Sequence, residues 1–267
     1  MPPTTDLLHR PDGSKVAFEV SGSAGDPAVV LVHGFGLTLR MWDPTIPDLV
    51  EAGWRVVTLD LRGHGLTNVA GNPGRFTLDA VVDDILALAD HLEVDQFVLG
   101  GLSLGGFVTL ATWVRAPSRL RALVLADSGP GFRNEDARKA WNATATDIAE
   151  RIEADGSTAV ADLGMTGRSD PAALGLDRHR SPRDLGAAAR GFLAQFDSRG
   201  MDALATITAP TIVLVGEDDT AFLAAARTMT AKIPNAQSVV IANAGHVSNV
   251  DNPEEFNRHL IGFLRKL

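Results

Sequence analysis

A serine flanked by glycines stands at the centre of the sequence Gly101-Leu102-Ser103-Leu104-Gly105. The apolar residues 97–100 before it are typical of a buried strand, and residues 106–114 after it of a helix. A serine at such a strand-to-helix turn matches the nucleophile elbow, a strained turn that exposes the hydroxyl and accepts only small neighbours. The N–H groups at the N-terminus of the helix would favour negative charge there. We therefore expect Ser103 to be a nucleophile rather than an incidental serine in a Gly-rich turn.

A serine hydroxyl needs a general base, and histidine is the usual one because its pKa lies near neutrality. His246 follows the last expected strand in a loop of small residues, and we expect it to be the base. For His33 and His64, which lie in Gly-flanked loops, the favoured interpretation is a structural role in holding the loop backbone. The other four histidines are expected to be exposed: His9, His91, His179 and His259.

The base in turn needs a carboxylate that fixes its tautomer and stabilises the imidazolium. Asp219 ends a Gly-x-x-Asp turn after an expected strand and is the favoured acid. Its neighbour Asp218 is the alternative, and Asp127, also at a strand end, is a weaker third choice. Asp60 is expected to be structural and to bind its own loop, residues 62–65.

Acyl transfer also needs hydrogen-bond donors aimed at the oxyanion of the tetrahedral intermediate. The backbone N–H of Leu104, at the start of the helix, is one candidate. The sequence His33-Gly34-Phe35-Gly36 supplies the second candidate, the N–H of Phe35.

The elements around these residues alternate between strand and helix. This alternation predicts an α/β fold with a mostly parallel, doubly wound sheet covered on both faces. Every polar motif above falls at the carboxyl end of an expected strand, where ligands bind in such sheets. The expected strands are residues 28–32, 55–60, 97–100, 121–126, 211–215 and 238–241, preceded by a hairpin over 7–20, and the expected helices are 42–52, 78–92, 106–114, 221–231 and 253–267. Thr77 is predicted to cap the second of these helices.

Residues 130–200 contain no strand-like run and predict a helical insertion. Asn134 can cap a first helix, and Ser181 with Pro182 resembles the start of another. The sequence therefore divides into a core, residues 1–129 and 201–267, and a helical cap, residues 130–200.

Composition narrows the classes of function. The chain has 267 residues and no cysteine, so it has no disulfide, thiolate nucleophile or cysteine metal site. Its net charge of −9 argues against a general nucleic-acid binder. No apolar run is long enough to span a membrane, and the N-terminus lacks the pattern of a signal peptide, so we expect a cytoplasmic protein. No cofactor or metal site is predicted, the expected partner is a small-molecule substrate, and the sequence does not indicate an oligomeric state.

Taken together, the chain resembles the α/β-hydrolase fold family over almost its whole length. The resemblance lies in five motifs in order, residues 33–36, 60–65, 101–105, 216–219 and 245–246, and in the C-terminal residues 253–264. It implies Ser103 as nucleophile, His246 as base and Asp219 as acid, with the N–H groups of Phe35 and Leu104 as oxyanion donors. The insertion corresponds to the family's helical cap. Two departures are Thr67, where many relatives have serine, and the absence of a proline soon after Asp219.

The residue types narrow the chemistry further. Epoxide hydrolases and haloalkane dehalogenases of this fold use aspartate at the elbow, whereas this chain has Ser103, and it has no tyrosine for an epoxide hydrolase cap. The sequence therefore favours hydrolysis of a carboxylic ester or lactone of a small to medium apolar substrate through an acyl-enzyme. The alternatives are carbon–carbon bond hydrolysis of a β-diketone or ring-cleavage product, perhydrolysis, and a small-ligand receptor that retains the hydrolase pocket.

Apolar side chains of the insertion and of the loops near Ser103 could line a substrate pocket. Many of them pack the cap onto the core in the simplest interpretation, so we expect two or three to face substrate. The candidates are Phe132, Trp141, Leu163, Phe192 and Phe196 in the cap, with Phe35, Trp42 and Val247 in the core.

Overall fold

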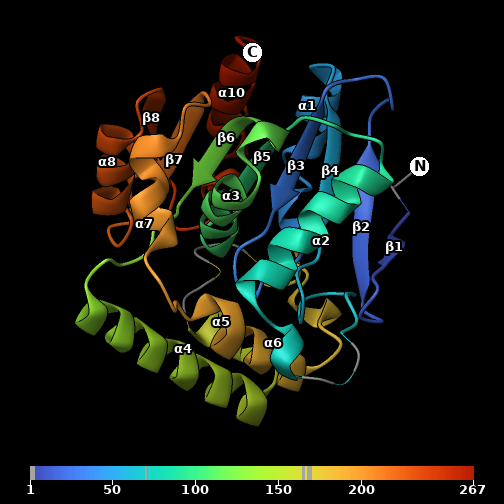
Figure 1. Ribbon diagram of the computed structural model, residues 1–267, viewed down its shortest axis with the longest axis vertical. Helices are drawn as coiled ribbons and strands as arrows, with labels where there is room; N and C mark the ends of the chain where they lie inside the picture. The colour runs from blue at the N-terminus through green and yellow to red at the C-terminus, as the bar shows by residue number, and fades with distance from the viewer. Residues whose placement is uncertain (1–3, 70, 72, 164–165, 167–169) are drawn as a thin grey trace.

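The computed structural model describes residues 4–69, 71, 73–163, 166 and 170–267, which form an eight-stranded sheet with helices on both faces (Figure 1). The strand order is β1-β2-β4-β3-β5-β6-β7-β8. β1 pairs with β2 and β2 with β4 in antiparallel fashion, and all other pairs are parallel. The predicted α/β class with a mostly parallel sheet is confirmed. The strands are Asp6–His9 (β1), Lys15–Ser21 (β2), Ala28–Val32 (β3), Arg55–Leu59 (β4), Phe97–Leu102 (β5), Leu120–Ala126 (β6), Thr211–Gly216 (β7) and Ala236–Ile241 (β8).

The central strands are apolar along their whole length because helices cover both faces of the sheet. All residues of β3, β5 and β7 are buried. Val32, the last residue of β3, pairs with Leu59 of β4 and Gly101 of β5. The carboxyl ends of three strands therefore meet at one edge, where the loops with the candidate residues begin.

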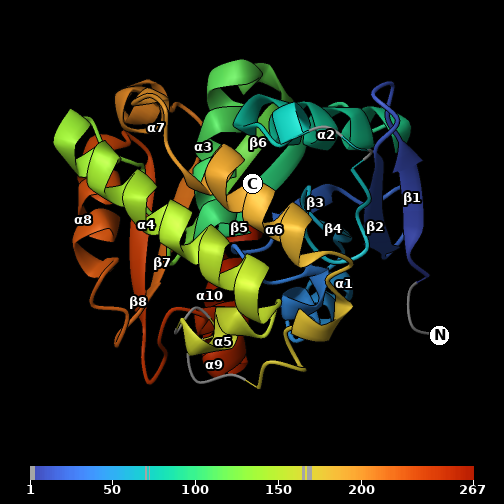
Figure 2. The ribbon, with the colours of Figure 1, turned by 90° about the horizontal axis from the view of Figure 1, so that it is seen from below.

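Helices α2 and α3 cover one face of the sheet, and α1 and α10 cover the other (Figure 2). α2 begins at Thr77, whose hydroxyl accepts the Ala80 N–H as predicted for an N-cap. The helices outside the insertion are Ile46–Glu51 (α1), Leu78–His91 (α2), Leu104–Arg115 (α3), Leu223–Lys232 (α8), Ser248–Asp251 (α9) and Pro253–Leu264 (α10), with short 3-10 helices at Leu39–Trp42 (η1), Pro73–Arg75 (η2), Pro117–Arg119 (η3) and Leu204–Thr206 (η6).

The helix predicted over residues 42–52 is confirmed only for residues 46–51, because the helix begins later than expected. The structure has the short helix η1 followed by the separate α1. Pro44 and Pro47 explain the break, because proline lacks the N–H that an interior helix position donates and fits only in the first turn. Pro47 accordingly occupies the first turn of α1.

Between β6 and β7, the described residues of the insertion form helices and no strand. We call residues 130–200 the cap segment. Its elements lie below the carboxyl ends of the central strands in Figure 1, and Asn134 and Ser181 cap α4 and α6 as predicted. They are Glu135–Asp155 (α4), Ala159–Asp162 (α5), the 3-10 helix Leu176–Arg178 (η4), Pro182–Ala188 (α6) and the π-helix Ala189–Leu193 (η5).

The chain returns to the sheet through α7 (Arg199–Ala203), which packs against α3. The boundary predicted between residues 200 and 201 therefore falls inside a helix rather than in a connecting loop. The division into a core of residues 1–129 and 201–267 and a cap stays a prediction.

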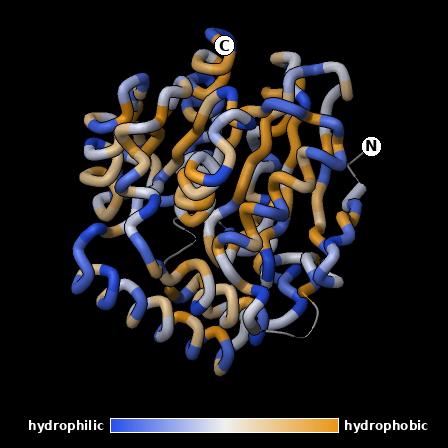
Figure 3. Tube along the Cα trace, viewed as in Figure 1, coloured by the Kyte–Doolittle hydropathy of each residue, from blue (hydrophilic) through white to orange (hydrophobic). Residues whose placement is uncertain are grey.

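Apolar residues concentrate along the central strands, whereas α4 carries many hydrophilic ones (Figure 3). This distribution agrees with a buried sheet and a partly solvated cap segment. Within the described ranges of the chain, no helix combines the length and the apolarity that crossing a membrane requires.

Candidate active site

Ser103 lies between β5 and α3 with a backbone conformation that L-residues rarely adopt, at φ 55° and ψ −113°. Its N–H donates to the Ala126 carbonyl at 2.9 Å, and its own carbonyl accepts the Ser128 hydroxyl at 2.7 Å. A strained residue of this kind persists only where its surroundings hold it, and such residues cluster at functional sites. The sharp turn predicted from the sequence is therefore present and anchored to β6.

Close backbone contacts require glycine at positions 101 and 105, on either side of Ser103. A Cβ on Gly101 would overlap the backbone of Gly105, and a Cβ on Gly105 would overlap the Val32 carbonyl at the end of β3. Any larger residue would push the turn away from β3. The glycine spacing thus allows α3 to begin directly against the sheet edge.

Three side chains from distant parts of the chain form a continuous line of hydrogen bonds. His246 Nε2 lies 2.9 Å from Ser103 Oγ, and His246 Nδ1 lies 2.8 Å from Asp219 Oδ2. The Asp219 side chain is 5 % exposed and that of His246 is 20 % exposed. The geometry allows the imidazole to accept the serine proton while its second nitrogen donates to the carboxylate. We call these residues the hydrogen-bonded triad.

The surroundings of His246 favour its protonated form. Burial lowers the pKa of His246, but the hydrogen bond and charge of Asp219 outweigh it, and the charges of Asp127 and Asp251 act in the same direction. The net pKa is raised above its ordinary value of 6.5. The ring of Phe222 stacks on the imidazole at a centroid distance of 4.8 Å. The imidazolium that forms when a serine is deprotonated is thus stabilised in this site.

The three candidate acids occupy different environments. Asp219 is buried and bonded to the imidazole, whereas the adjacent Asp218 is exposed. Asp127 is fully buried, and its carboxyl group accepts the Gly216 N–H and both the N–H and the hydroxyl of Ser248. Burial raises the pKa of Asp127 to about 7. Asp219 is therefore the candidate that contacts His246, and Asp127 joins the ends of β6 and β7 to α9.

The loop that follows β3 lies beside Ser103. A Cβ on Gly34 would stand 3.5 Å from the Ser103 Cβ. Phe35, the next residue, is buried, and Leu104 is the first residue of α3. Both predicted oxyanion donors thus belong to segments that border Ser103, and their role stays a prediction.

Two histidines hold the loops around this edge, as predicted. His33 donates from Nδ1 to the Gly34 carbonyl at 2.7 Å and accepts the Leu61 N–H on Nε2 at 2.9 Å. His64 donates from Nδ1 to the Arg62 carbonyl at 3.0 Å. Burial lowers the pKa of His33 to about 4 and that of His64 well below its ordinary value, so both rings are neutral near pH 7.

The prediction that His179 is exposed is wrong. This cap-segment residue is half-buried, donates from Nε2 to the Gly36 carbonyl at 2.7 Å and accepts the Gly65 N–H on Nδ1 at 2.9 Å. A single side chain of the cap segment therefore joins the loops after β3 and β4. The sequence offered no signal for this role because both partners are backbone atoms in remote loops.

Asp60 has a structural role, as predicted, although its partners differ from those expected. Its carboxylate accepts the N–H groups of Leu39 and Leu66, both at 2.8 Å, rather than those of residues 62–65. The Thr67 hydroxyl donates to the Asp60 carbonyl at 2.6 Å. Thr67 therefore provides a hydroxyl that closes this loop.

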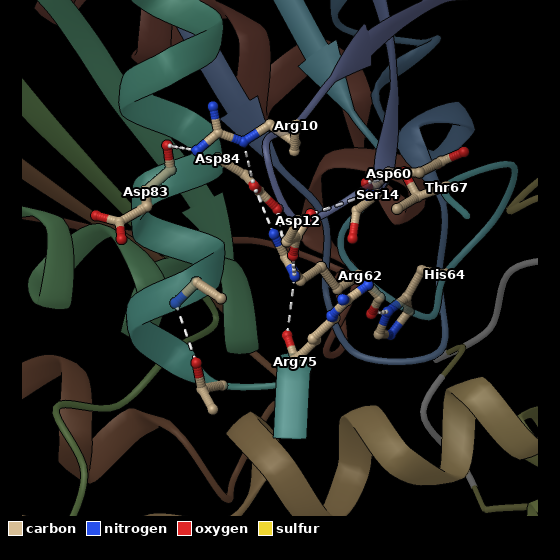
Figure 4. Close-up of polar contacts among 12 residues, drawn as sticks. Arg10, Asp12, Ser14, Asp60, Arg62, His64, Thr67, Arg75, Asp83 and Asp84 are labelled. Atoms are coloured by element: carbon tan, nitrogen blue, oxygen red, sulfur yellow. Dashed lines mark hydrogen bonds and ion pairs between the residues drawn. The ribbon is translucent and has the colours of Figure 1, made fainter. Parts of the chain in front are cut away.

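An ion-pair network centred on the buried side chains of Arg62 and Asp84 anchors the loop after β4 (Figure 4). Arg62 donates to Asp84 from Nε and Nη2 at 2.7 and 2.9 Å, and from Nη1 to Asp12 at 2.7 Å and to the Arg75 carbonyl at 3.0 Å. Arg10 donates to Asp84 at 2.8 Å. The network joins the loop to α2 and to the β1–β2 turn, and it lies outside the hydrogen-bonded triad.

A cavity of about 480 Å³ opens beside the hydrogen-bonded triad, which forms part of its wall. Phe132 and Trp141 of the cap segment lie in the wall, where the sequence placed them, with ring centroids 6.2 Å apart. Their contact with substrate stays a prediction.

The structure does not support the other expected lining residues. Trp42 and Val247 are fully buried in the core, and the ring of Trp42 lies 6.3 Å from that of Phe256 between centroids. Phe196 is 71 % exposed. None of these three lies in the cavity wall, nor do Leu163, Phe192 and Phe35.

Sequence reasoning missed several residues of the wall. Phe107 follows Ser103 by four residues and so lies on the same face of α3, a spacing that could have indicated it. Phe222 follows Asp219 by three residues, and this short spacing could also have indicated it. Leu193 and Gln195 gave no such signal because Leu193 ends, and Gln195 follows, a π-helix that the sequence did not predict. The remaining described wall residues are Leu104, Gly129, Pro130, Gly131, Ala221 and Ala225.

Among the described residues, no group of three or more histidine, cysteine, aspartate or glutamate side chains is placed to hold a metal ion.

Comparison with known proteins identifies the family of this fold. A family model described as alpha/beta hydrolase fold matches residues 27–253. The chain belongs to this family. The elements that carry the hydrogen-bonded triad, from β3 to the loop before α9, all fall within the matched range.

Three proteins match this α/β hydrolase over most of both chains. It is 29% identical to 3-oxoadipate enol-lactonase 1 of Acinetobacter baylyi, over 98% of this chain and 97% of the relative. It is 32% identical to a pimeloyl-[acyl-carrier protein] methyl ester esterase of Aromatoleum aromaticum, over 86% and 94%. A solved thermophilic esterase from Thermogutta terrifontis superposes with a TM-score of 0.84 at 30% identity, over 100% and 99% of the two chains.

Proposed function

We propose that this protein is a serine hydrolase that cleaves a carboxylic ester or lactone of a small to medium, neutral substrate through an acyl-enzyme. The observation that carries the proposal is the line of hydrogen bonds from Ser103 through His246 to Asp219 in the wall of a cavity of about 480 Å³. The names of the relatives support the bond type, since they include an enol-lactonase and a methyl ester esterase.

In the first half of the reaction, Ser103 Oγ attacks the carbonyl carbon while His246 Nε2 takes its proton. Asp219 holds the Nδ1 proton and stabilises the imidazolium. The N–H groups of Phe35 and Leu104 stabilise the oxyanion, a contribution worth about 2.7–4 kcal/mol for each donor. His246 then gives its proton to the leaving oxygen, and the acyl group stays on Ser103.

In the second half, water replaces the leaving group. His246 removes a proton from the water, whose oxygen attacks the acyl carbon and forms the same oxyanion. Collapse of this intermediate returns the proton to Ser103 Oγ and releases the carboxylic acid. For a lactone, the released product contains both the acid and the alcohol.

The cavity wall indicates a neutral substrate portion. Large apolar side chains dominate it, and no lysine or arginine is among its described residues. A carboxylate of the substrate would lose hydration there without gaining an opposite charge, which costs several kcal/mol. The wall is formed in part by Phe107, Phe132, Trp141, Leu193 and Phe222.

The test is a panel of p-nitrophenyl esters of increasing acyl length and simple lactones, measured with the wild type, Ser103→Ala and the exposed-site control Ser118→Ala. We expect turnover by the wild type and the control, and a loss of about 10⁶-fold in kcat for Ser103→Ala. Turnover retained by Ser103→Ala would contradict covalent catalysis. A panel without turnover, together with tight binding of one small molecule, would instead support a receptor.

A further inference from the structure

One polar residue of the cavity wall, Gln195, is fixed by contacts that do not involve the hydrogen-bonded triad. It follows the π-helix η5 of the cap segment. The side chain of Asn142 in α4 binds both the N–H and the carbonyl of Gln195. Asn142 Nδ2 donates to the Gln195 carbonyl at 2.8 Å, and Asn142 Oδ1 accepts the Gln195 N–H at 2.7 Å. Nearby, Trp141 Nε1 donates to the Leu193 carbonyl at 2.7 Å. The backbone of this segment is therefore held against α4.

The side chain of Gln195 is also oriented. The Phe132 N–H lies 3.1 Å from Gln195 Oε1. Because a backbone N–H can only donate, the amide atom facing it must be the oxygen, which assigns the amide orientation. The adjacent Gly131 approaches closely, since a Cβ there would stand 2.7 Å from the same oxygen. The oxygen of the amide is thus occupied by the loop that precedes α4.

The nitrogen of the Gln195 amide, unlike its oxygen, is not held by a neighbouring described residue. Within the described part of the chain, Gln195 Nε2 has no hydrogen-bond partner, and Gln195 is a wall residue of the cavity. Its neighbours in the wall include the rings of Phe132 and Trp141, which offer no acceptor oxygen. The amide therefore presents two N–H donors in an otherwise apolar part of the site.

We propose that Gln195 selects substrates that carry a second oxygen, a ketone or ether that accepts a hydrogen bond from Nε2, in addition to the ester or lactone that reacts at Ser103. The inference rests on the proposed function and names its substrate class more closely. A neutral acceptor fits because the donor is uncharged and no lysine or arginine is among the described wall residues. A site that has a donor in place discriminates against an analogue that lacks the acceptor, because the donor is then left unpaired.

The experiment compares pairs of esters that differ in one oxygen acceptor. On the acyl side, p-nitrophenyl esters with an oxo group at successive chain positions are compared with their methylene parents. On the alcohol side, methoxyethyl butanoate is compared with butyl butanoate. The readout is the ratio of kcat/KM within each pair. For the wild type we expect the oxygen-bearing ester to be favoured by about tenfold in at least one pair, the value of one well-placed hydrogen bond.

Two variants remove the donor in different ways. Gln195→Leu deletes the amide, and Gln195→Glu keeps the acceptor that binds the Phe132 N–H but has no N–H. Both should lose the preference, so that the ratio falls towards one. Gln237→Leu, on the edge strand β8 and outside the cavity wall, is the matched control and should keep the wild-type ratio. If Gln195→Leu does not fold, the wild-type ratios and Gln195→Glu still decide the question.

The inference is overturned if no pair shows a preference in the wild type, or if the preference persists in Gln195→Glu. Its failure is distinguishable from failure of the proposed function. Where only this inference fails, the parent esters are still hydrolysed through Ser103. Where the proposed function fails, no ester in either series is turned over.

Discussion

Asp218 and Asp219 are adjacent in the sequence, yet only one of them can orient the base. Asp219 is buried against His246 Nδ1, and Asp218 is exposed. We expect Asp219→Asn to lower kcat by about 10⁴-fold, as in a well-studied triad in which the amide favours the wrong tautomer. Asp218→Asn should change kcat by less than about threefold, as for most surface substitutions. Steady-state kinetics of both variants with one ester checks this prediction. Similar losses of kcat in the two variants would contradict the assignment of Asp219 as the carboxylate that orients His246.

The raised pKa of His246 predicts how activity depends on pH. Only the neutral imidazole can accept the Ser103 proton, so kcat/KM should rise with pH and reach its midpoint above 6.5. Loss of the negative charge in Asp219→Asn removes a group that stabilises the imidazolium, and the midpoint should move to lower pH. A pH–rate profile of both proteins is the measurement. A midpoint that stays fixed or rises in Asp219→Asn contradicts the assigned contact.

Residue types alone indicated the hydrogen-bonded triad because its members follow strands. Ser103, Asp219 and His246 each stand just after a strand whose apolar run is plain in the sequence, and parallel strands bring such positions to one edge. The choice between Asp218 and Asp219 needed the structure, because the rotation of the turn decides which carboxylate is buried. The bridging role of His179 was not predictable, since the sequence does not show which backbone atoms a cap residue will meet.

At the scale of elements, the loop after β4 depends on the buried pair Arg62–Asp84. Asp84→Ala would leave the Arg62 guanidinium buried with Asp12 as its remaining charged partner. Breaking a buried pair in this way costs about 3–5 kcal/mol. The matched control is Asp83→Ala, because Asp83 is exposed and pairs with Arg115 at 3.6 Å on the surface. It should cost less than about 0.5 kcal/mol.

Urea unfolding of both variants gives the free energies of unfolding directly. Equal, small losses would show that the ion-pair network does not hold the loop. A large loss in Asp84→Ala alone supports the view that α2, the β1–β2 turn and the loop after β4 form one supported unit.

The elements of the sheet were easier to predict than those of the cap segment. Buried parallel strands read as continuous apolar runs, and caps such as Thr77 mark helix starts. The cap segment contains a π-helix, a rare element without a clear sequence pattern, and it sets the positions of Leu193 and Gln195. Trp42 and Val247 were mistaken for wall residues because apolar character does not distinguish a cavity wall from the core beneath it.

For the whole molecule, buried histidines make stability depend on pH. The folded protein holds His33 with a pKa of about 4 and lowers the pKa of His64 and His179, mainly through burial. In the unfolded chain these groups titrate near 6.5. As pH falls from about 6.5 towards 4, the unfolded chain takes up protons that the folded chain does not, so stability is lost.

Asp127 acts in the opposite direction. Its folded pKa of about 7 exceeds the unfolded value, so the folded chain takes up its proton first as pH falls. Burial also raises the pKa values of Asp43 and Asp184, which act in the same direction as Asp127. We expect the three histidines to dominate, so that the free energy of unfolding decreases between pH 6.5 and 4.5, by about 1.4 kcal/mol per pH unit for each net proton. Urea unfolding at intervals across this range measures it. Stability that is constant or rises on acidification would contradict the buried, neutral state of these rings.

The most direct test of the account is labelling with a fluorophosphonate probe, which reacts with an activated serine. Intact-mass and peptide analysis should show one adduct per chain, located on Ser103. The adduct should be absent in Ser103→Ala and should form far more slowly in His246→Ala, which lacks the base. An active wild-type enzyme that takes no label, or takes it on another serine, would contradict the claim that Ser103 is the nucleophile.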